Sequence, residues 1–294
     1  MKLSRRKFLK SGSIALAGTV VMPQLACMTK HSAGKMDVGL QLYSLRDELP
    51  KGVAPVISEV AKAGYNFVEV FDYQKGKGFW GLDPRELKAL FDRHQLKSPS
   101  GHYDFAPWEQ TQDDKILEDY LKTAIILKHQ YIVVPHINPD IFTSAEKVKR
   151  FAQQLNHIAQ VFGKEDIKLA YHNHDFEFQQ LGEQSGYEIL LQETDPRLVD
   201  FELDIYWAIR SNQKIPQLFE NNKGRFPLWH IKDMDKKNPQ LNTEIGSGTI
   251  DFKSLLRQSE IAGLKFPIVE QENFAIPPFE SIQKSHDFIM KLEN

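Results

Sequence analysis

Residues 168–178 read KLAYHNHDFEF, and this stretch is the key to the fold. An apolar run, Leu169–Tyr171, passes directly into His172, Asn173 and His174 and then into carboxylates. A buried parallel strand is a short apolar run, and polar side chains at its end are typical of a reactive edge. The tip is therefore a metal site, an acid–base site or a crowded surface turn.

The apolar run belongs to a series of eight along the chain. Their first residues lie 29, 30, 34, 36, 32, 29 and 40 positions apart, and each gap contains a helix-like pattern. Repeated βα units over about 250 residues predict an α/β fold, a single (β/α)₈ TIM barrel. The expected strands are Val38–Tyr43, Phe67–Phe71, Lys97–His102, Tyr131–His136, Ile167–His172, Val199–Asp204, Leu228–Lys232 and Ile268–Glu272.

The segments between these strands carry helix signals. Residues 53–63 place Val and Ile on one face and end at Gly64, a C-terminal capping glycine. Asp83 and Pro84 supply an N-cap and a first-turn proline to the next helix. The other expected helices are Lys115–Leu127, Ala145–Phe162, Ser185–Glu193, Ile215–Phe219 and Phe252–Ala262.

The first 27 residues have a different character. Residues 4–10, SRRKFLK, match the twin-arginine export motif S-R-R-x-F-L-K, and the apolar segment that follows is shorter than the roughly 20 residues of a membrane span. Cys27 is the only cysteine, and its position favours lipidation over a lone structural thiol, although Gln24 departs from the usual lipidation motif. We predict a signal peptide over 1–27, a linker over 28–37, a catalytic barrel over 38–294, and export to the periplasm or to a membrane as an anchored lipoprotein.

Without its first 27 residues the chain is acidic. That segment carries five basic residues and no acidic one, which leaves 37 − 5 = 32 basic against 39 acidic side chains, a net charge of −7. Phosphate backbones require a basic face. Nucleic acid is therefore not an expected partner, and a membrane contact is expected only through the lipid anchor.

Polar residues gather where the predicted barrel needs them. The active site of a TIM barrel lies at the C-terminal ends of its strands, and residues i and i+2 of a strand face the same side. Five of the ten histidines fall at these ends, which chance explains poorly. The polar residues there are Gln41, Tyr43, Glu69, His102, His136, His172, His174, Glu202, Asp204, His230, Lys232, Glu270 and Glu272.

Four of these residues form a candidate metal site. Asp204, His230 and Glu270 come from three successive predicted strands, and His172 comes from the strand before them. Two imidazoles and two carboxylates suit Mn²⁺, Co²⁺, Fe²⁺ or Zn²⁺, with Mg²⁺ also acceptable, better than Ca²⁺. The alternative is a set of ion pairs and hydrogen bonds, which leaves packed carboxylates in need of compensation. We therefore predict one divalent metal ion.

Five motifs in order, YHNHDFEF, FELDIYWA, HIKDMD, IGSGTIDF and IVEQE, resemble the xylose-isomerase-like TIM barrels called sugar phosphate isomerases/epimerases. The resemblance runs from about Val38 to the C-terminus. It implies a divalent metal held by Glu, Asp, His and Glu of the later strands, and chemistry on a hydroxy-ketone sugar through a metal-bound enediolate. Asp204, His230 and Glu270 match the family's metal ligands.

Two positions depart from the family pattern. His172 stands where many members have a glutamate that is both a ligand and one of two acid–base groups, and Trp207 stands where many have a histidine. The symmetric two-glutamate epimerase mechanism therefore does not transfer whole.

Other acid–base candidates remain for removing the α-proton that a metal ion acidifies. Lys232 is expected to have a pKa lowered beside the cation, and the alternative for it is a salt bridge to Asp233 or another carboxylate. Glu69 and His174 are the other candidate catalytic residues. The candidate substrate-binding residues are Gln41, Tyr43, His102, His136, Glu202 and Trp207, and Phe71 and Trp80 are further apolar candidates.

Residues 245–252, IGSGTIDF, allow two interpretations. Their backbone amides could cradle an anion such as phosphate. A glycine turn in which Thr249 or Asp251 caps the next helix is the favoured interpretation. Sugar phosphates are also scarce outside the cytoplasm, so the expected substrate is not phosphorylated.

The first functional hypothesis is a metal-dependent isomerase or epimerase of a non-phosphorylated keto-sugar. The alternative is a lyase or hydratase that eliminates across a 3-keto-glycoside or related keto-sugar, with an exported sugar oxidoreductase as a functional partner. Both begin with removal of an α-proton. A non-catalytic sugar-binding lipoprotein is a third hypothesis. Abasic-site endonuclease is a fourth, which the net charge and the export signal disfavour.

Overall fold

The computed structural model describes residues 36–292. The predicted signal peptide, Cys27 and most of the predicted linker lie outside these residues and stay predictions. In the described part of the chain, no helix combines the length and apolar character needed to cross a membrane.

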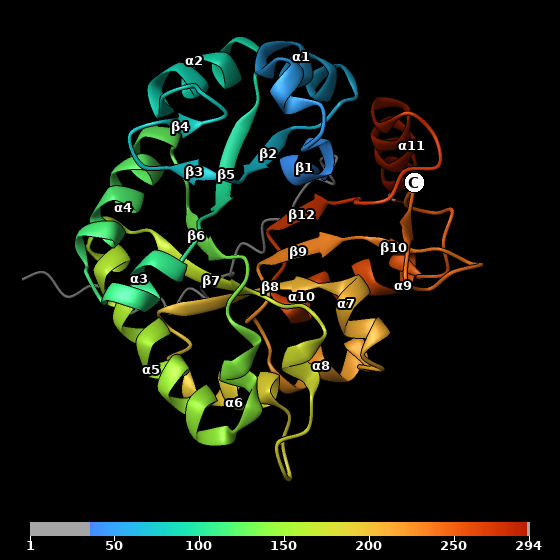
Figure 1. Cartoon of the computed structure of the whole chain (residues 1–294). Coiled ribbons are helices and arrows are strands. Elements are labelled where there is room, and N and C mark those ends of the chain that lie inside the picture. Colours follow the sequence, from blue (N-terminus) through green and yellow to red (C-terminus); the bar gives the residue numbers. More distant parts are fainter. Residues whose placement is uncertain (1–35, 293–294) are drawn as a thin grey trace, which may run out of the picture. The chain divides into compact units, whose positions relative to one another are not determined.

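Eight parallel strands close into a barrel in the order β1-β12-β9-β8-β7-β6-β5-β2, and β2 pairs back to β1. Helices surround the barrel (Figure 1). The predicted (β/α)₈ TIM barrel is therefore confirmed, with each strand beginning within two residues of its predicted start. The barrel strands are β1 (Gly39–Gln41), β2 (Phe67–Val70), β5 (Lys97–His102), β6 (Tyr131–Val134), β7 (Lys168–His172), β8 (Val199–Asp204), β9 (Leu228–Ile231) and β12 (Phe266–Val269).

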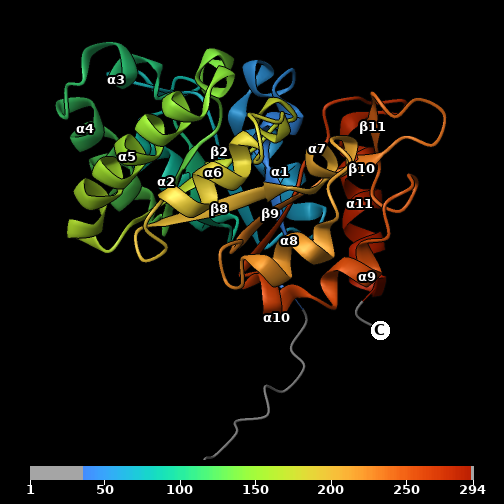
Figure 2. The same cartoon turned by 90° about the horizontal axis from the view of Figure 1, so that it is seen from below.

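The helices confirm most of the predicted segments, and α4 and α5 have the predicted bounds. The helix predicted over 252–262 is divided in two, and no prediction covered α3, α7 or the C-terminal α11, which lies at the edge of Figure 2. The helices are α1 (Val53–Lys62), α2 (Pro84–Arg93), α3 (Ala106–Thr111), α4 (Lys115–Leu127), α5 (Ala145–Phe162), α6 (Gly186–Glu193), α7 (Ile205–Arg210), α8 (Ile215–Asn221), α9 (Phe252–Leu256), α10 (Ser259–Ala262) and α11 (Pro278–Leu292).

The loops contain shorter elements. Two antiparallel hairpins, β3 (Tyr73–Gln74) with β4 (Gly78–Phe79) and β10 (Asp233–Met234) with β11 (Asn242–Thr243), follow β2 and β9. The 3₁₀ turns are η1 (Leu42–Leu45), η2 (Leu49–Lys51), η3 (Pro139–Thr143), η4 (Gly163–Glu165) and η5 (Phe176–Phe178).

The helix ends follow their capping residues. The Asp83 carboxylate accepts hydrogen bonds from the backbone of α2, and the Glu86 carboxylate accepts one from the backbone N–H of Asp83, a complete capping box. Ser185 and Glu188 repeat the arrangement at α6. After α1 the chain turns at Gly64, whose φ of 96° favours glycine, as predicted.

Side chains inside the barrel change from apolar to polar along its axis. A buried apolar cluster includes Phe67, Ala170, Leu228 and Ile268. Alternation along a strand places the residue two positions later on the same interior side. On these four strands that residue is Glu69, His172, His230 and Glu270. The barrel interior is therefore apolar deeper along the strands and polar toward their C-terminal ends. The main hydrophobic core packs between the strands and the helices.

Candidate metal centre and cavity

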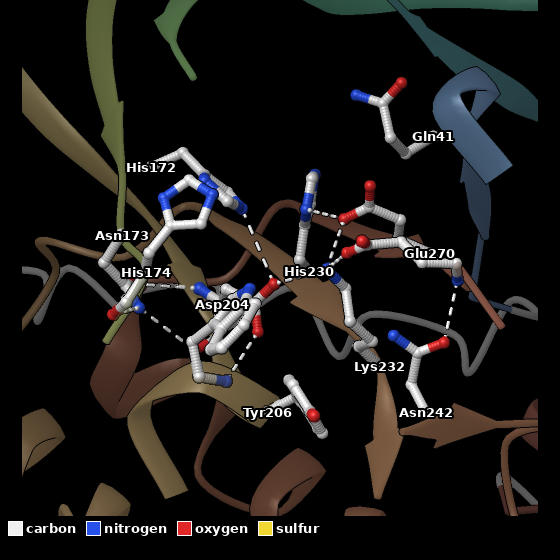
Figure 3. A network of polar contacts seen from close by, with 12 residues as sticks. Gln41, His172, Asn173, His174, Asp204, Tyr206, His230, Lys232, Asn242 and Glu270 are labelled. Carbon is white, nitrogen blue, oxygen red and sulfur yellow. Dashed lines mark hydrogen bonds and ion pairs between the residues drawn. The ribbon is translucent and has the colours of Figure 1, made fainter. Parts of the chain in front are cut away.

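Strand register brings the predicted metal ligands together. Asp204 at the end of β8 lies beside His230 of β9. His172 at the end of β7 lies beside Glu202, two residues before Asp204 on β8. The backbone N–H of Glu270 donates to Ile231, which extends β12 along β9. His172, Asp204, His230 and Glu270 are buried, and their ligand atoms all lie within 4.8 Å of one another (Figure 3).

We call His172, Asp204, His230 and Glu270 the outer set. Three of its atoms make no hydrogen bond: His172 Nε2, Asp204 Oδ2 and His230 Nδ1. The first two are 3.5 Å apart, and His230 Nδ1 lies 2.8 Å from Glu270 Oε2 without hydrogen-bond geometry. Buried polar atoms are normally paired. Two imidazole nitrogens and two carboxylate oxygens around one point fit a divalent ion of borderline character, such as Zn²⁺, Mn²⁺, Co²⁺ or Fe²⁺.

His172 is held in the form that binds metals. Its Nδ1 lies 3.2 Å from the carbonyl oxygen of Pro135, and this hydrogen bond leaves Nε2 facing the other ligands. Burial, with His230 and His102 adding to it, lowers the pKa of His172 well below its usual value. A neutral imidazole is the form that ligates a metal.

Asp204 is fixed by the backbone on both sides. Its Oδ1 accepts from the backbone N–H of Trp207 at 2.9 Å and so caps α7, which leaves Oδ2 for the ligand set. Asn173 clamps the same residue, because its side chain accepts from the Asp204 N–H at 3.1 Å and donates to the Asp204 carbonyl at 3.3 Å. The cap and the clamp orient the carboxylate before any ligand binds.

Lys232 places a cation among the carboxylates. Its Nζ lies 3.1 Å from Asp204 Oδ2, 2.9 Å from Glu270 Oε2 and 2.7 Å from Glu272 Oε1. Burial lowers the pKa of Lys232, but these three carboxylates outweigh burial and hold the pKa well above its usual value. The lowered pKa predicted for Lys232 assumed a neighbouring metal cation and stays a prediction; among the protein groups alone the pKa is raised. The salt bridges predicted as the alternative are present, though not with Asp233.

A second buried set lies deeper in the barrel: Glu69, His102, Glu202 and, shared with the outer set, His230. We call it the inner set. Its facing atoms are hydrogen-bonded, with His230 Nε2 2.8 Å from Glu69 Oε2 and His102 Nε2 2.7 Å from Glu202 Oε2. Gln41 adds a hydrogen bond of 2.7 Å to Glu69 Oε2. Protein partners therefore satisfy the facing atoms Glu69 Oε2, Glu202 Oε2, His102 Nε2 and His230 Nε2, whereas the second oxygens, Glu69 Oε1 and Glu202 Oε1, have no hydrogen-bond partner.

The inner set balances its own charge. Burial lowers the pKa of His102, but Glu69 and Glu202 outweigh it and raise the pKa to about 9. Burial and the neighbouring Glu69 raise the pKa of Glu202 to about 7. Burial also acts to raise the pKa of Glu69, but His102 and His230 hold it well below its usual value. Imidazolium and carboxylate groups thus neutralise each other beneath the outer set.

A cavity of about 710 Å³ opens above the outer set. Three predicted residues do not line it: Glu69, Gln41 and Glu202 are fully buried in or beside the inner set. The prediction of Glu69 as an acid–base group and of Gln41 and Glu202 as substrate contacts is corrected accordingly. The predicted residues that line the cavity are Tyr43, Phe71, His102, His136, His172, His174, Trp207, Lys232 and Glu270.

The sequence analysis missed several residues of the cavity wall. Asp72, Tyr73 and Gln74 line it from the loop and hairpin after β2, and Asp104 lines it from the loop after β5. Glu272 also lines it and was noted only as a strand-end residue. A signal was present, because Asp72 and Asp104 each follow a predicted strand by one or two positions.

His174 lies beside the ligands without joining them. Its ring centre is 4.9 Å from that of His172 and 5.8 Å from that of Trp207. Burial, with His172 and Lys232 adding to it, lowers the pKa of His174 to about 2. The buried carboxylate of Glu177 accepts from the His174 backbone N–H at 2.9 Å and fixes the loop. The stretch at 168–178 is therefore a buried strand end and not a surface turn.

The glycine-rich loop over 245–252 is a turn. Its amides at Gly246, Gly248 and Ile250 donate to the carboxylate of Asp233 at 2.8–3.1 Å. Asp251 caps α9. The favoured interpretation, a glycine turn with a helix cap, is confirmed. The amides that the alternative interpretation assigned to anion binding are bound to a protein carboxylate.

Residues 57–292 match the family described as the Xylose isomerase-like TIM barrel. The chain belongs to this family. A solved structure described as a sugar phosphate isomerase/epimerase from Parabacteroides distasonis ATCC 8503 is 27% identical, with 92% of this chain and 98% of that chain covered and a TM-score of 0.78.

Two solved structures of lower sequence identity share the fold. A D-allulose 3-epimerase from Methylomonas sp. is 14% identical over 88% of this chain and 98% of that chain, with a TM-score of 0.67. An IOLI protein with a binding zinc atom is 16% identical over 87% and 98%, with a TM-score of 0.68. A comparison with curated proteins gave no match.

Proposed function

We propose that the protein is a divalent-metal-dependent isomerase or epimerase of a non-phosphorylated keto-sugar. The observation that carries the proposal is the outer set, whose four ligand atoms lie within 4.8 Å of one another under the cavity, three of them without a hydrogen bond. Membership of the family and the 27% identical sugar phosphate isomerase/epimerase support an enzyme of this class.

The cavity's charge supports a substrate without phosphate. Asp72, Asp104, Glu270 and Glu272 line it, and Lys232 is the one Lys or Arg side chain among its lining residues. A phosphate dianion would face this excess of carboxylates. The glycine-rich loop offers no compensation, because Asp233 already accepts from its amides.

A bound divalent ion would polarise a sugar carbonyl and stabilise the enediolate charge that develops when the α-proton leaves. The chain's own groups then move the proton. Lys232, kept protonated by its carboxylate neighbours, donates hydrogen bonds to substrate oxygen, and Glu272, in contact with Lys232, presents an acceptor to the cavity. His174 stands on β7's side of the cavity, across β8 and β9 from β12, so proton-handling groups flank a substrate on two sides (Figure 3).

A lyase or hydratase is the second candidate, and His174 favours it. Its Nδ1 is buried without a hydrogen-bond partner, and its lowered pKa keeps the ring neutral. An imidazole whose pKa is lowered this far is a weak base for an α-proton, but its N–H can donate to a departing oxygen. Elimination would begin with the same α-proton removal and then expel the β-substituent.

The experiment is NMR of free ketoses and keto-glycosides in D₂O with metal-loaded protein. Deuterium at the α-carbon without bond cleavage supports isomerisation, and release of water or an aglycone supports elimination. D204N should abolish either signal. D200N is the matched control, because Asp200 is buried on the same strand but pairs with Lys168 at 2.9 Å. Absence of exchange with every metal, together with unchanged sugar binding in D204N, would favour a non-catalytic sugar-binding protein.

We also propose that the chain is exported by its twin-arginine segment and anchored through Cys27, and that an exported sugar oxidoreductase supplies its substrate. The proposal rests on the motif at 4–10 and the position of Cys27. Cell fractionation of the full chain beside R5K/R6K and C27S variants tests it. Export of the arginine variant would contradict the first part, and membrane retention of C27S the second.

A further inference from the structure

We infer that Glu69, itself held by Gln41, positions His230 so that its Nδ1 faces the metal. The inference rests on the proposed metal site and assigns Glu69 a positioning role in place of the acid–base role predicted from the sequence.

His230 has two differently occupied ring nitrogens. Nε2 lies 2.8 Å from Glu69 Oε2 in a hydrogen bond, whereas Nδ1 faces the outer set and lies 2.8 Å from Glu270 Oε2 without hydrogen-bond geometry. A neutral imidazole has one N–H and one lone pair, and the partner of the N–H decides which nitrogen is free to bind a metal. When Nδ1 binds an ion, a carboxylate at Nε2 therefore keeps the remaining proton there and leaves the lone pair on Nδ1.

Glu69 is itself prevented from turning. Gln41 Nε2 donates to the same Oε2 at 2.7 Å, and the orientation of the Gln41 amide is fixed because its Oε1 accepts from the Tyr43 backbone N–H at 2.9 Å. Register supports the arrangement, since Gln41 of β1 lies directly beside Glu69 of β2. All three side chains of the relay Gln41–Glu69–His230 have no exposed surface.

The other members of the inner set do not replace Glu69. Glu202 Oε2 is 3.3 Å from His230 Nε2, but its hydrogen bond, at 2.7 Å, goes to His102. His102 stacks beside the His230 ring, with 5.2 Å between centroids and 20° between planes. Glu202 therefore makes the shorter contact with His102 and Glu69 the shorter contact with His230, although Glu69 Oε2 also lies 3.2 Å from His102 Nε2. This division makes Glu202 a matched control of the same chemistry, layer and burial.

The primary test is titration of metal-free protein with Zn²⁺ by calorimetry. E69Q should bind about 10- to 100-fold more weakly than the wild type, the usual effect of removing such a partner. The glutamine cannot offer a carboxylate to the fixed Gln41 amide and to His230 together. E202Q should bind within threefold of the wild type. Equal affinity of E69Q and wild type, or an equal loss in E202Q, overturns the inference.

A second measurement is made on the wild type, and a variant is needed only to assign the signal. Long-range ¹H–¹⁵N spectra of the histidine-labelled, zinc-loaded wild type should show His230 with a proton on Nε2 and a coordinated Nδ1, assigned by the signal lost in H230Q. Coordination through Nε2, or metal seated in the inner set, overturns the inference. If the wild type binds no ion at all, both the positioning role and the proposed function are refuted. If the wild type binds the ion and E69Q binds it equally well, only the positioning role is refuted.

Discussion

Removal of one outer ligand should separate metal binding from folding. D204N keeps the oxygen that accepts from Trp207 and caps α7, and it replaces only Oδ2, which lies 3.5 Å from His172 Nε2 and 3.1 Å from Lys232 Nζ. Lys232 retains Glu270 and Glu272 as partners. The metal-free D204N protein should therefore melt within a few degrees of the metal-free wild type.

The metal response should differ sharply. A ligand at 100 times its Kd stabilises the native state by about 2.7 kcal/mol. In a domain of this size each kcal/mol raises Tm by about 2–4 °C, so saturating Mn²⁺, Co²⁺ or Zn²⁺ should raise the wild-type Tm by about 5–10 °C. The rise should disappear in D204N and persist in D200N. Scanning calorimetry with and without a chelator measures it, and an undiminished rise in D204N would refute the assignment of Asp204 as a ligand.

Three further predictions concern the scaffold. G248A should lower the unfolding free energy by about 2–3 kcal/mol, because the added Cβ would lie 2.2 Å from Asp233 Oδ1, whereas G163A, with nothing within 4 Å, should be near neutral in denaturant titration. D83A should cost about 1 kcal/mol by removing the α2 N-cap, and an unchanged midpoint would contradict it. Burial raises the pKa of Glu177 from 4.5 to about 8, so its contribution to stability is present below pH 4.5 and is lost as pH rises through 8. E177Q should remove roughly 3–5 kcal/mol of that decline relative to wild type, and parallel stability curves against pH would exclude it.

The sequence predicted the barrel because its strands are continuous apolar runs with regular spacing. The helix predicted over 252–262 divides because the backbone N–H of Gln258 bonds to Leu255, three residues back, a turn that apolar periodicity does not encode. The C-terminal helix α11 was missed because its buried face includes Ser281 and Ser285. Ser281 there donates to the carboxylate of Glu244, a tertiary contact with no local signal.

The candidate site was predicted by residue type but not by depth. Alternation along a strand shows which side chains point inward, yet a residue two positions earlier lies about 6.6 Å deeper. Glu202 and Asp204 point the same way on β8, but register places Asp204 beside His230 and Glu202 beside Leu228 of the apolar cluster. Height within the barrel depends on how neighbouring strands are staggered, and this is a property of the closed sheet.

Lys232 has a consequence for the order in which the protein is assembled. Its ammonium group already occupies the space between Asp204 and Glu270, so like charges are separated before any ion arrives. The barrel can therefore close before the proposed ion binds. Binding of that ion would then replace one cation by another, unlike in zinc-dependent domains that are unfolded until they bind their ion.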